Sequence, residues 1–94
     1  MLDGNNYLGR VVLSKAGRDK DKFFIVLGIL DDEYIYISDG FLRGVDKPKK
    51  KKMKHLVFTN VVSEEIRSLL MSGEKVSNAV IRNFLQSYDN NKEV

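Results

Sequence analysis

The sequence predicts a small α+β domain that is mainly β, with a strongly curved barrel of about five strands followed by two short helices. Its 94 residues are the length of one domain. The first part of the chain holds short β-branched and aromatic segments joined by connections of a few residues. After residue 60 the apolar spacing becomes helical. Five short strands in about 52 residues cannot make a broad sandwich, so we expect a small barrel.

Five segments have the composition of strands. The clearest reads F-F-I-V-L-G-I-L and ends at an acidic turn. Another alternates, so that Tyr34 and Tyr36 share one face while Ile35 and Ile37 share the other. The predicted strands cover residues 9–15, 23–30, 33–38, 42–45 and 55–59.

Two helices are expected after the strands. Ser63 is a plausible N-cap for the first, Gly73 is a natural stop for it, and Ser77 is a plausible N-cap for the second. We therefore divide the chain into a barrel, residues 1–60, and a helical extension packed on it, residues 61–94. The apolar stripe of the second helix would close the open end of the barrel, or could bind a protein partner. It consists of Val80, Ile81, Phe84, Leu85 and Tyr88.

The charge distribution is strongly uneven. Residues 47–54 place six lysines in eight positions, and Pro48 makes this run a loop or an edge strand. Residues 43–55 hold seven Lys and Arg against one Asp, which gives +6, and residues 10–22 hold five against two, which gives +3. Since the whole chain is +3, the remainder carries −6. So many ammonium groups must face solvent or a polyanion, and a dense basic block in a small protein most often contacts nucleic acid.

Several function classes find no support. The chain has no Cys, which excludes disulfides and thiolate metal sites, and we expect neither metal nor cofactor. His55 is the only histidine and lacks ligand-spaced partners, and the acidic triplet at 31–33, which could bind Mg²⁺, is explained more simply as a turn. No catalytic motif is present, so we expect no catalytic residues and no enzyme. Without a long apolar run or a signal-like start, the expected location is cytoplasmic, with no membrane contact.

Residues 9–26, G-R-V-V-L-S-K-A-G-R-D-K-D-K-F-F-I-V, resemble the KOW family of ribosomal and transcription-elongation domains. The family pattern is an apolar strand, a turn around an obligate glycine rich in Arg, Lys and Asp, and a second apolar strand. Gly17 matches that glycine, which allows positive φ and close approach to a phosphate or base. Many members carry a further glycine where this chain has Asp21, a residue type that tolerates the left-handed region.

The resemblance continues through residues 39–43, D-G-F-L-R, and 47–56, K-P-K-K-K-K-M-K-H-L. Together these segments look like the bacterial KOW-domain RNA-binding proteins, which are similar to a KOW ribosomal protein of the archaeal and eukaryotic large subunit. The match covers residues 9–60, with 76–82 as an extension. It implies an SH3-like barrel, no enzymatic activity, and binding of RNA, most plausibly ribosomal RNA or the ribosome. The expected RNA-binding residues are Lys15, Gly17, Arg18, Lys20, Lys22, Arg43, Lys47, Lys49, Lys50, Lys51, Lys52, Lys54 and His55.

Each of these features also has a simpler interpretation. The lysine run could be a solvated loop, Gly17 could be only a hairpin corner, and Tyr34 and Tyr36 could lie in the core or on the surface instead of stacking on bases. The rival function is a KOW protein-interaction module of the transcription or translation machinery. The two functions differ in how binding depends on salt. If RNA binding neutralises about five phosphates, the logarithm of the binding constant should fall with the logarithm of the salt concentration, with a slope of about −3.5 on single strands to −4.5 on duplex. An apolar protein contact would survive high salt.

Overall fold

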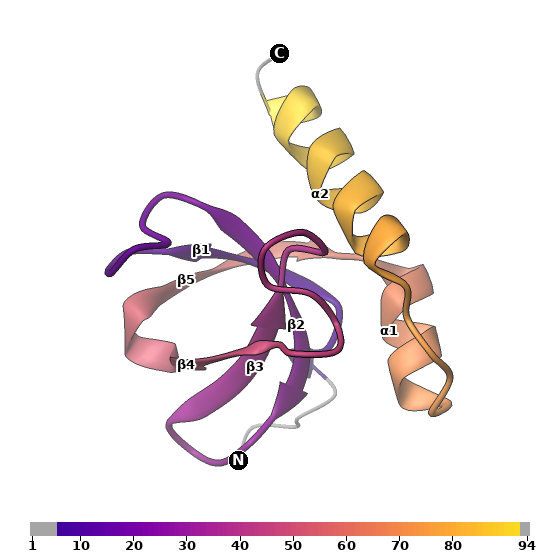
Figure 1. Cartoon of the computed structure of the whole chain (residues 1–94), viewed down its shortest axis with the longest axis horizontal. Helices are drawn as coiled ribbons and strands as arrows, with labels where there is room; N and C mark the ends of the chain where they lie inside the picture. Colours follow the sequence, from indigo (N-terminus) through magenta and orange to yellow (C-terminus); the bar gives the residue numbers. More distant parts are fainter. Residues whose placement is uncertain (1–5, 93–94) are drawn as a thin grey trace.

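The computed structural model describes residues 6–92, so residues 1–5 and 93–94 of the two predicted segments lie outside it. It contains five strands and two α-helices, which confirms a small, mainly β, α+β fold (Figure 1). A 3-10 turn, η2, joins the last two strands. The elements are β1 Arg10–Ser14, β2 Phe23–Ile29, β3 Tyr34–Ser38, β4 Lys49–Lys52, η2 Met53–His55, β5 Leu56–Val62, α1 Glu64–Met71 and α2 Asn78–Lys92.

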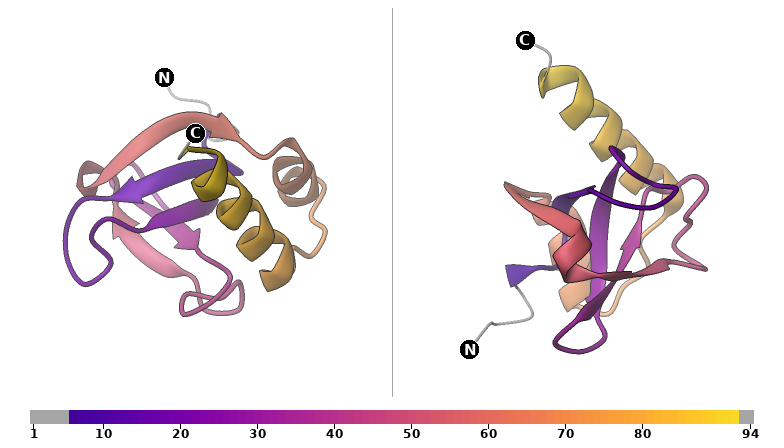
Figure 2. Two further views of the ribbon diagram at one scale, coloured as in Figure 1. Left: turned by 90° about the horizontal axis from the view of Figure 1, so that it is seen from above. Right: turned by 90° about the vertical axis from the view of Figure 1, so that its left-hand side faces the viewer.

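All five strands belong to one antiparallel sheet in the order β4-β3-β2-β1-β5. The two outermost strands, β4 and β5, follow each other in sequence and are separated only by η2. In a flat sheet four strand spacings would hold them about 19 Å apart, whereas the four residues from Lys52 to Leu56 reach at most about 14 Å. The sheet must therefore curl, and Figure 2 shows that it does.

Hydrogen bonds of η2 fix this curl. Its first residue, Met53, donates its N–H to the carbonyl of Glu33, just before β3, over 2.8 Å. Its last residue, His55, accepts from the N–H of Lys15, just after β1, also over 2.8 Å. The short turn thus links the two halves of the sheet. Register shifts in β1 and β2 add the local bending that irregular pairing produces.

β1 and the first half of β2 are buried on both faces, which explains why the run 23–27 is apolar without alternation. Neighbouring residues of one strand point to opposite faces and pack in two different hydrophobic clusters. Val12 and Phe24 join one, while Val11 and Ile25 join the other together with helix residues. The first cluster is completed by Val26, Ile35, Ile37 and Leu56, and the second by Ile66, Val76, Ile81 and Leu85. The helical stripe of α2 therefore packs on the sheet.

The helix ends are as predicted. The Ser63 hydroxyl accepts from the N–H of Ile66 over 3.2 Å, and the Ser77 hydroxyl accepts from the N–H of Val80 over 3.2 Å. These are the N-cap contacts that satisfy otherwise unpaired amides of a first turn. Gly73 follows α1 with φ of +76°, the left-handed conformation that ends many helices.

The predicted strand over residues 42–45 is wrong, because the segment folds into a loop. The Asp39 carboxylate accepts from the N–H groups of Phe41 and Arg43, over 2.8 and 2.9 Å, which turns the chain back on itself. The fourth strand is instead Lys49–Lys52, so of the two alternatives for the lysine run the edge strand is correct. An edge strand has one neighbour and suits charged side chains despite their low β-propensity. β5 also continues to Val62 instead of ending at residue 59.

Candidate nucleic-acid interface

The turn between β1 and β2 has the geometry expected around Gly17. Gly17 has φ of +80°, and its carbonyl accepts from the N–H of Lys20 over 3.2 Å. Asp21 also occupies the left-handed region, with φ of +71°. Asp21 thus adopts the left-handed conformation that its residue type tolerates. Two backbone hydrogen bonds of Ser14 close the base of the turn. Its carbonyl accepts from the N–H of Asp21 over 2.8 Å, and its N–H donates to the carbonyl of Lys22 over 3.0 Å.

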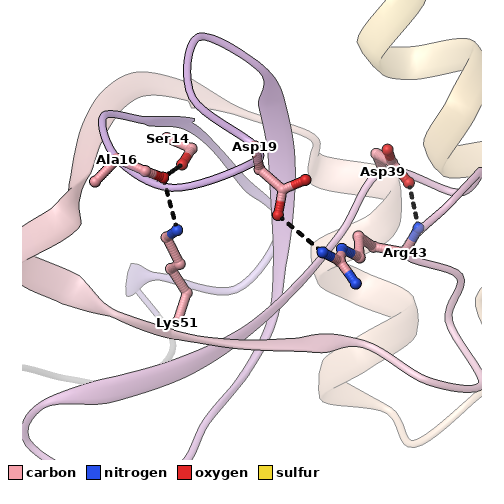
Figure 3. A network of polar contacts seen from close by, with 6 residues as sticks. All are labelled: Ser14, Ala16, Asp19, Asp39, Arg43 and Lys51. Atoms are coloured by element: carbon pink, nitrogen blue, oxygen red, sulfur yellow. Dashed lines mark hydrogen bonds and ion pairs between the residues drawn. The ribbon is translucent and has the colours of Figure 1, made fainter.

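One acid of this turn faces inward. Asp19 is buried, and its carboxylate lies 3.3 Å from the guanidinium of Arg43, whose side chain is one-third exposed (Figure 3). Arg18, Lys20 and Lys22 are exposed. The turn thus presents cations to solvent and removes one negative charge from its surface. Sequence reasoning counted Asp19 only as a charge, because Asp21 alternates with basic residues in the same way and is exposed, so the local pattern does not distinguish the two acids.

Lys51 connects the lysine strand to this turn. It lies opposite Ile35 in the β3–β4 pairing, and its ammonium group donates to the carbonyl of Ala16 over 3.0 Å. The Ser14 hydroxyl donates to the same carbonyl over 3.1 Å. Figure 3 shows Lys51 reaching from β4 to the turn. Two basic segments that are far apart in sequence therefore adjoin in the structure, with the Lys51 ammonium engaged between them.

The other face of the β4 edge carries lysines paired with tyrosines. Lys52 lies opposite Tyr34, and Lys50 opposite Tyr36. The ammonium groups of Lys50 and Lys52 lie 5.0 and 5.8 Å from the centre of the Tyr34 ring, within cation–π range. Both tyrosines are half-buried while Ile35 and Ile37 are buried, so the interpretation that the tyrosines form the core is wrong. Base stacking on them stays a prediction.

The remaining predicted residues are spread around this surface. Lys54 is exposed on η2, and the half-buried His55 is tied to Lys15 through its backbone carbonyl. Lys49 continues the strand opposite Ile37. Lys47 lies in the preceding turn, where its N–H donates to the carbonyl of Gly44 over 3.2 Å. Arg43, through its contact with Asp19, holds the turn instead of projecting freely.

The acidic triplet is accounted for by a turn. The Asp31 carboxylate accepts from the N–H groups of Glu33 and Tyr34 over 2.8 and 2.9 Å. Such contacts stabilise the chain reversal between β2 and β3. Across residues 6–92, no group of three or more acidic or histidine side chains is placed to hold a metal ion.

Sequence reasoning did not identify Phe41 and Leu42 as exposed. It placed Leu42 in the predicted strand over residues 42–45 and Phe41 just before that strand. Their side chains are 75% and 73% exposed at the tip of the β3–β4 loop. They line a groove of about 680 Å³ that also includes Lys22 from the basic turn. The usable signal was a pair of large apolar residues placed directly after the Asp39-Gly40 turn.

No protein-family model matches this chain, and no curated protein matches it. Among the helices of the described residues, none has the length and apolarity needed to cross a membrane.

Proposed function

We propose that this protein binds structured ribosomal RNA as a non-enzymatic KOW-type protein of the translation apparatus. The observation that carries the proposal is the hydrogen bond from the Lys51 ammonium to the carbonyl of Ala16. It places the Gly17 turn beside the lysine strand, so that the exposed cations of the turn lie next to β4, while Lys50 and Lys52 extend from the other face of that strand. A surface of this kind matches the closely spaced phosphates of a folded RNA.

An SH3-like barrel is the architecture that best fits the sheet. The order β4-β3-β2-β1-β5, the 3-10 turn between its last two strands and the required curl all support a barrel that brings both ends of the sheet together. In this arrangement the contact of Lys51 with Ala16 brings the β1–β2 turn to the β4 edge. The KOW resemblance rests on residues 9–60, and the observed φ values at Gly17 and Asp21 support it.

The cations divide into two roles. Lys51 and Arg43 hold the surface together through Ala16 and Asp19, so their charges act mainly by positioning. The others would contact phosphates and release bound counterions, which makes binding steeply salt-dependent. Arg18 could also hold a phosphate or a guanine edge with two hydrogen bonds. The contacting residues would be Lys15, Arg18, Lys20, Lys22, Lys49, Lys50, Lys52 and Lys54.

Co-sedimentation with ribosomes across a salt series tests this proposal. The variant is Lys49→Gln/Lys50→Gln/Lys52→Gln, which spares Lys51 and therefore the contact with Ala16. Lys75→Gln, an exposed lysine outside both basic segments, is the control. We expect wild type and control to follow a ribosomal subunit at low salt while the variant stays at the top of the gradient. If wild type also stays at the top, a stable ribosomal role is excluded. Should the variant sediment with the wild type, the lysine strand is not the anchor.

The rival proposal, a protein-interaction module that uses the stripe of α2, is less well supported. Ile81 and Leu85 of that stripe are buried, and Val80, Phe84 and Tyr88 pack against the same cluster. A partner using this face would have to displace the helix from the sheet. Binding that persists in 0.5 M salt and is insensitive to the lysine variant would favour the rival.

A further inference from the structure

The β3–β4 loop presents two large apolar side chains to solvent. Phe41 and Leu42 are 75% and 73% exposed, well above Met71 at 53%, the next most exposed large apolar residue in the part of the chain that the structure describes. Exposed apolar residues scattered singly are common on protein surfaces, whereas contiguous exposed apolar surface marks interaction sites. The pair therefore needs an explanation beyond the fold.

The loop that carries the pair is firmly held from within. The Asp39 carboxylate binds the N–H groups of Phe41 and Arg43, and the Ser38 hydroxyl donates to the carbonyl of Arg43 over 2.6 Å. Since the backbone on both sides of the tip is fixed, Phe41 is displayed in a defined place. A partner that binds it avoids most of the entropy cost of ordering a flexible loop.

The loop is also held against the first turns of α2 (Figure 1). The Arg82 guanidinium donates to the carbonyl of Gly40 over 2.9 Å, and the Asn78 side chain accepts from the N–H of Val45 over 2.7 Å. A side chain at Gly40 would collide with the carbonyl oxygen of Asn78, so the approach is as close as backbone allows. The loop and α2 form the two walls of the groove.

The charges of the groove suit a neutral ring better than an anion. Five ionisable residues line it: Asp21, Lys22, Asp39, Arg82 and Asp89. Three of them are acidic and two are basic, so the lining carries a net charge of −1. A phosphate would meet net repulsion there. The remaining walls are formed largely by Phe23, Phe41, Leu42 and Leu85, against which a flat apolar ring can pack.

The groove adjoins the basic turn, because Asp21 and Lys22 belong to both. The ion pair between Arg43 and Asp19 fixes the loop to that turn. A partner seated here lies beside the cations of the turn, so a polyanion that also offers neutral planar groups fits both surfaces, and an RNA with an unpaired base has both properties. We propose that Phe41 stacks on an unpaired nucleobase that enters this groove, while the neighbouring phosphates lie on the turn. Asp21 would accept a hydrogen bond from an exocyclic amino group of adenine or cytosine. This inference rests on the proposed RNA binding and specifies the kind of RNA.

Two RNA hairpins of the same stem sequence, one fully paired and one with a single bulged adenine, test the inference. Their binding is measured by fluorescence anisotropy at several salt concentrations. We expect Phe41→Ala to weaken binding of the bulged hairpin by about 5- to 100-fold, the range for losing one stacked base. Binding of the paired hairpin and the salt slope for both should be unchanged, because no cation is removed. Met71→Ala, which truncates an exposed apolar side chain on α1, should change neither.

A second variant reports the contact directly. The chain has no Trp, so Phe41→Trp introduces a single indole at the tip of the loop. We expect its fluorescence to be quenched by the bulged hairpin and little affected by the paired one, with affinity retained. If Phe41→Ala leaves the bulged hairpin bound as tightly as wild type does, or weakens both hairpins equally, the stacking proposal is overturned while RNA binding stands, and the pair is better assigned to a protein partner. If wild type binds neither hairpin at low salt, RNA binding itself fails.

Discussion

At the scale of single residues, Asp21 holds a conformation that favours glycine, with φ of +71°. The left-handed region costs most L-residues about 1–2 kcal/mol, and Asp somewhat less. We therefore expect Asp21→Gly to stabilise the protein by up to about 1 kcal/mol and Asp21→Ala to destabilise it by a similar amount. Urea unfolding of the three proteins measures both changes. A glycine variant less stable than wild type would contradict the strain argument.

The pair of Asp19 and Arg43 is a second test at this scale. Asp19 is buried and Arg43 is one-third exposed, so their 3.3 Å contact is partly shielded from solvent. A double-mutant cycle with Asp19→Asn and Arg43→Met should give a coupling free energy of about 1–2 kcal/mol, above the value typical of exposed pairs. The coupling should persist in 0.5 M salt. A coupling below about 0.3 kcal/mol would show that the contact does not hold the turn.

At the scale of elements, the approach of the β3–β4 loop to α2 depends on Gly40. It has φ of +72°, and an added Cβ would meet the backbone of Asn78. Gly73 is a matched control, because its φ is +76° and an added Cβ would meet nothing within 4 Å. Gly73→Ala should cost about 1 kcal/mol, the price of the left-handed backbone alone, whereas Gly40→Ala should cost about 2–4 kcal/mol. Equal losses on urea unfolding would mean that the loop does not pack tightly on α2.

The same loop shows where sequence reasoning reaches its limit. Caps and stops act through the next few residues, so Ser63, Gly73 and Ser77 were predictable from their neighbours. Strand identity depends on pairing with distant segments, and nothing local shows that Lys49–Lys52 pairs with β3. The two basic segments of the candidate site could be named, but not their contact through Lys51. The groove was not predictable either, since it forms only when α2 packs beside the loop.

At the scale of the whole molecule, the uneven charge predicts how binding responds to salt. Each phosphate contact that is lost should reduce the slope of the logarithm of the binding constant against the logarithm of the salt concentration by about 0.7–0.9. Lys50→Gln removes an exposed cation of the lysine strand and should reduce the slope by that amount. Lys75→Gln removes another exposed cation, outside the basic segments, and should leave the slope unchanged. Both variants lower the net charge by one, so an effect of total charge would change the salt slopes of the two variants equally.

Arg43→Met completes this comparison. Because Arg43 is engaged with Asp19, its loss should weaken binding by loosening the turn while leaving the salt slope close to that of wild type. Affinities of wild type and the three variants for one structured RNA, measured at five or more salt concentrations, separate the roles. A slope reduced by Arg43→Met as much as by Lys50→Gln would place Arg43 on a phosphate. Equal slopes for Lys50→Gln and Lys75→Gln would mean that the partner responds to total charge, and a surface built from the Gly17 turn and β4 would then have no special part in binding.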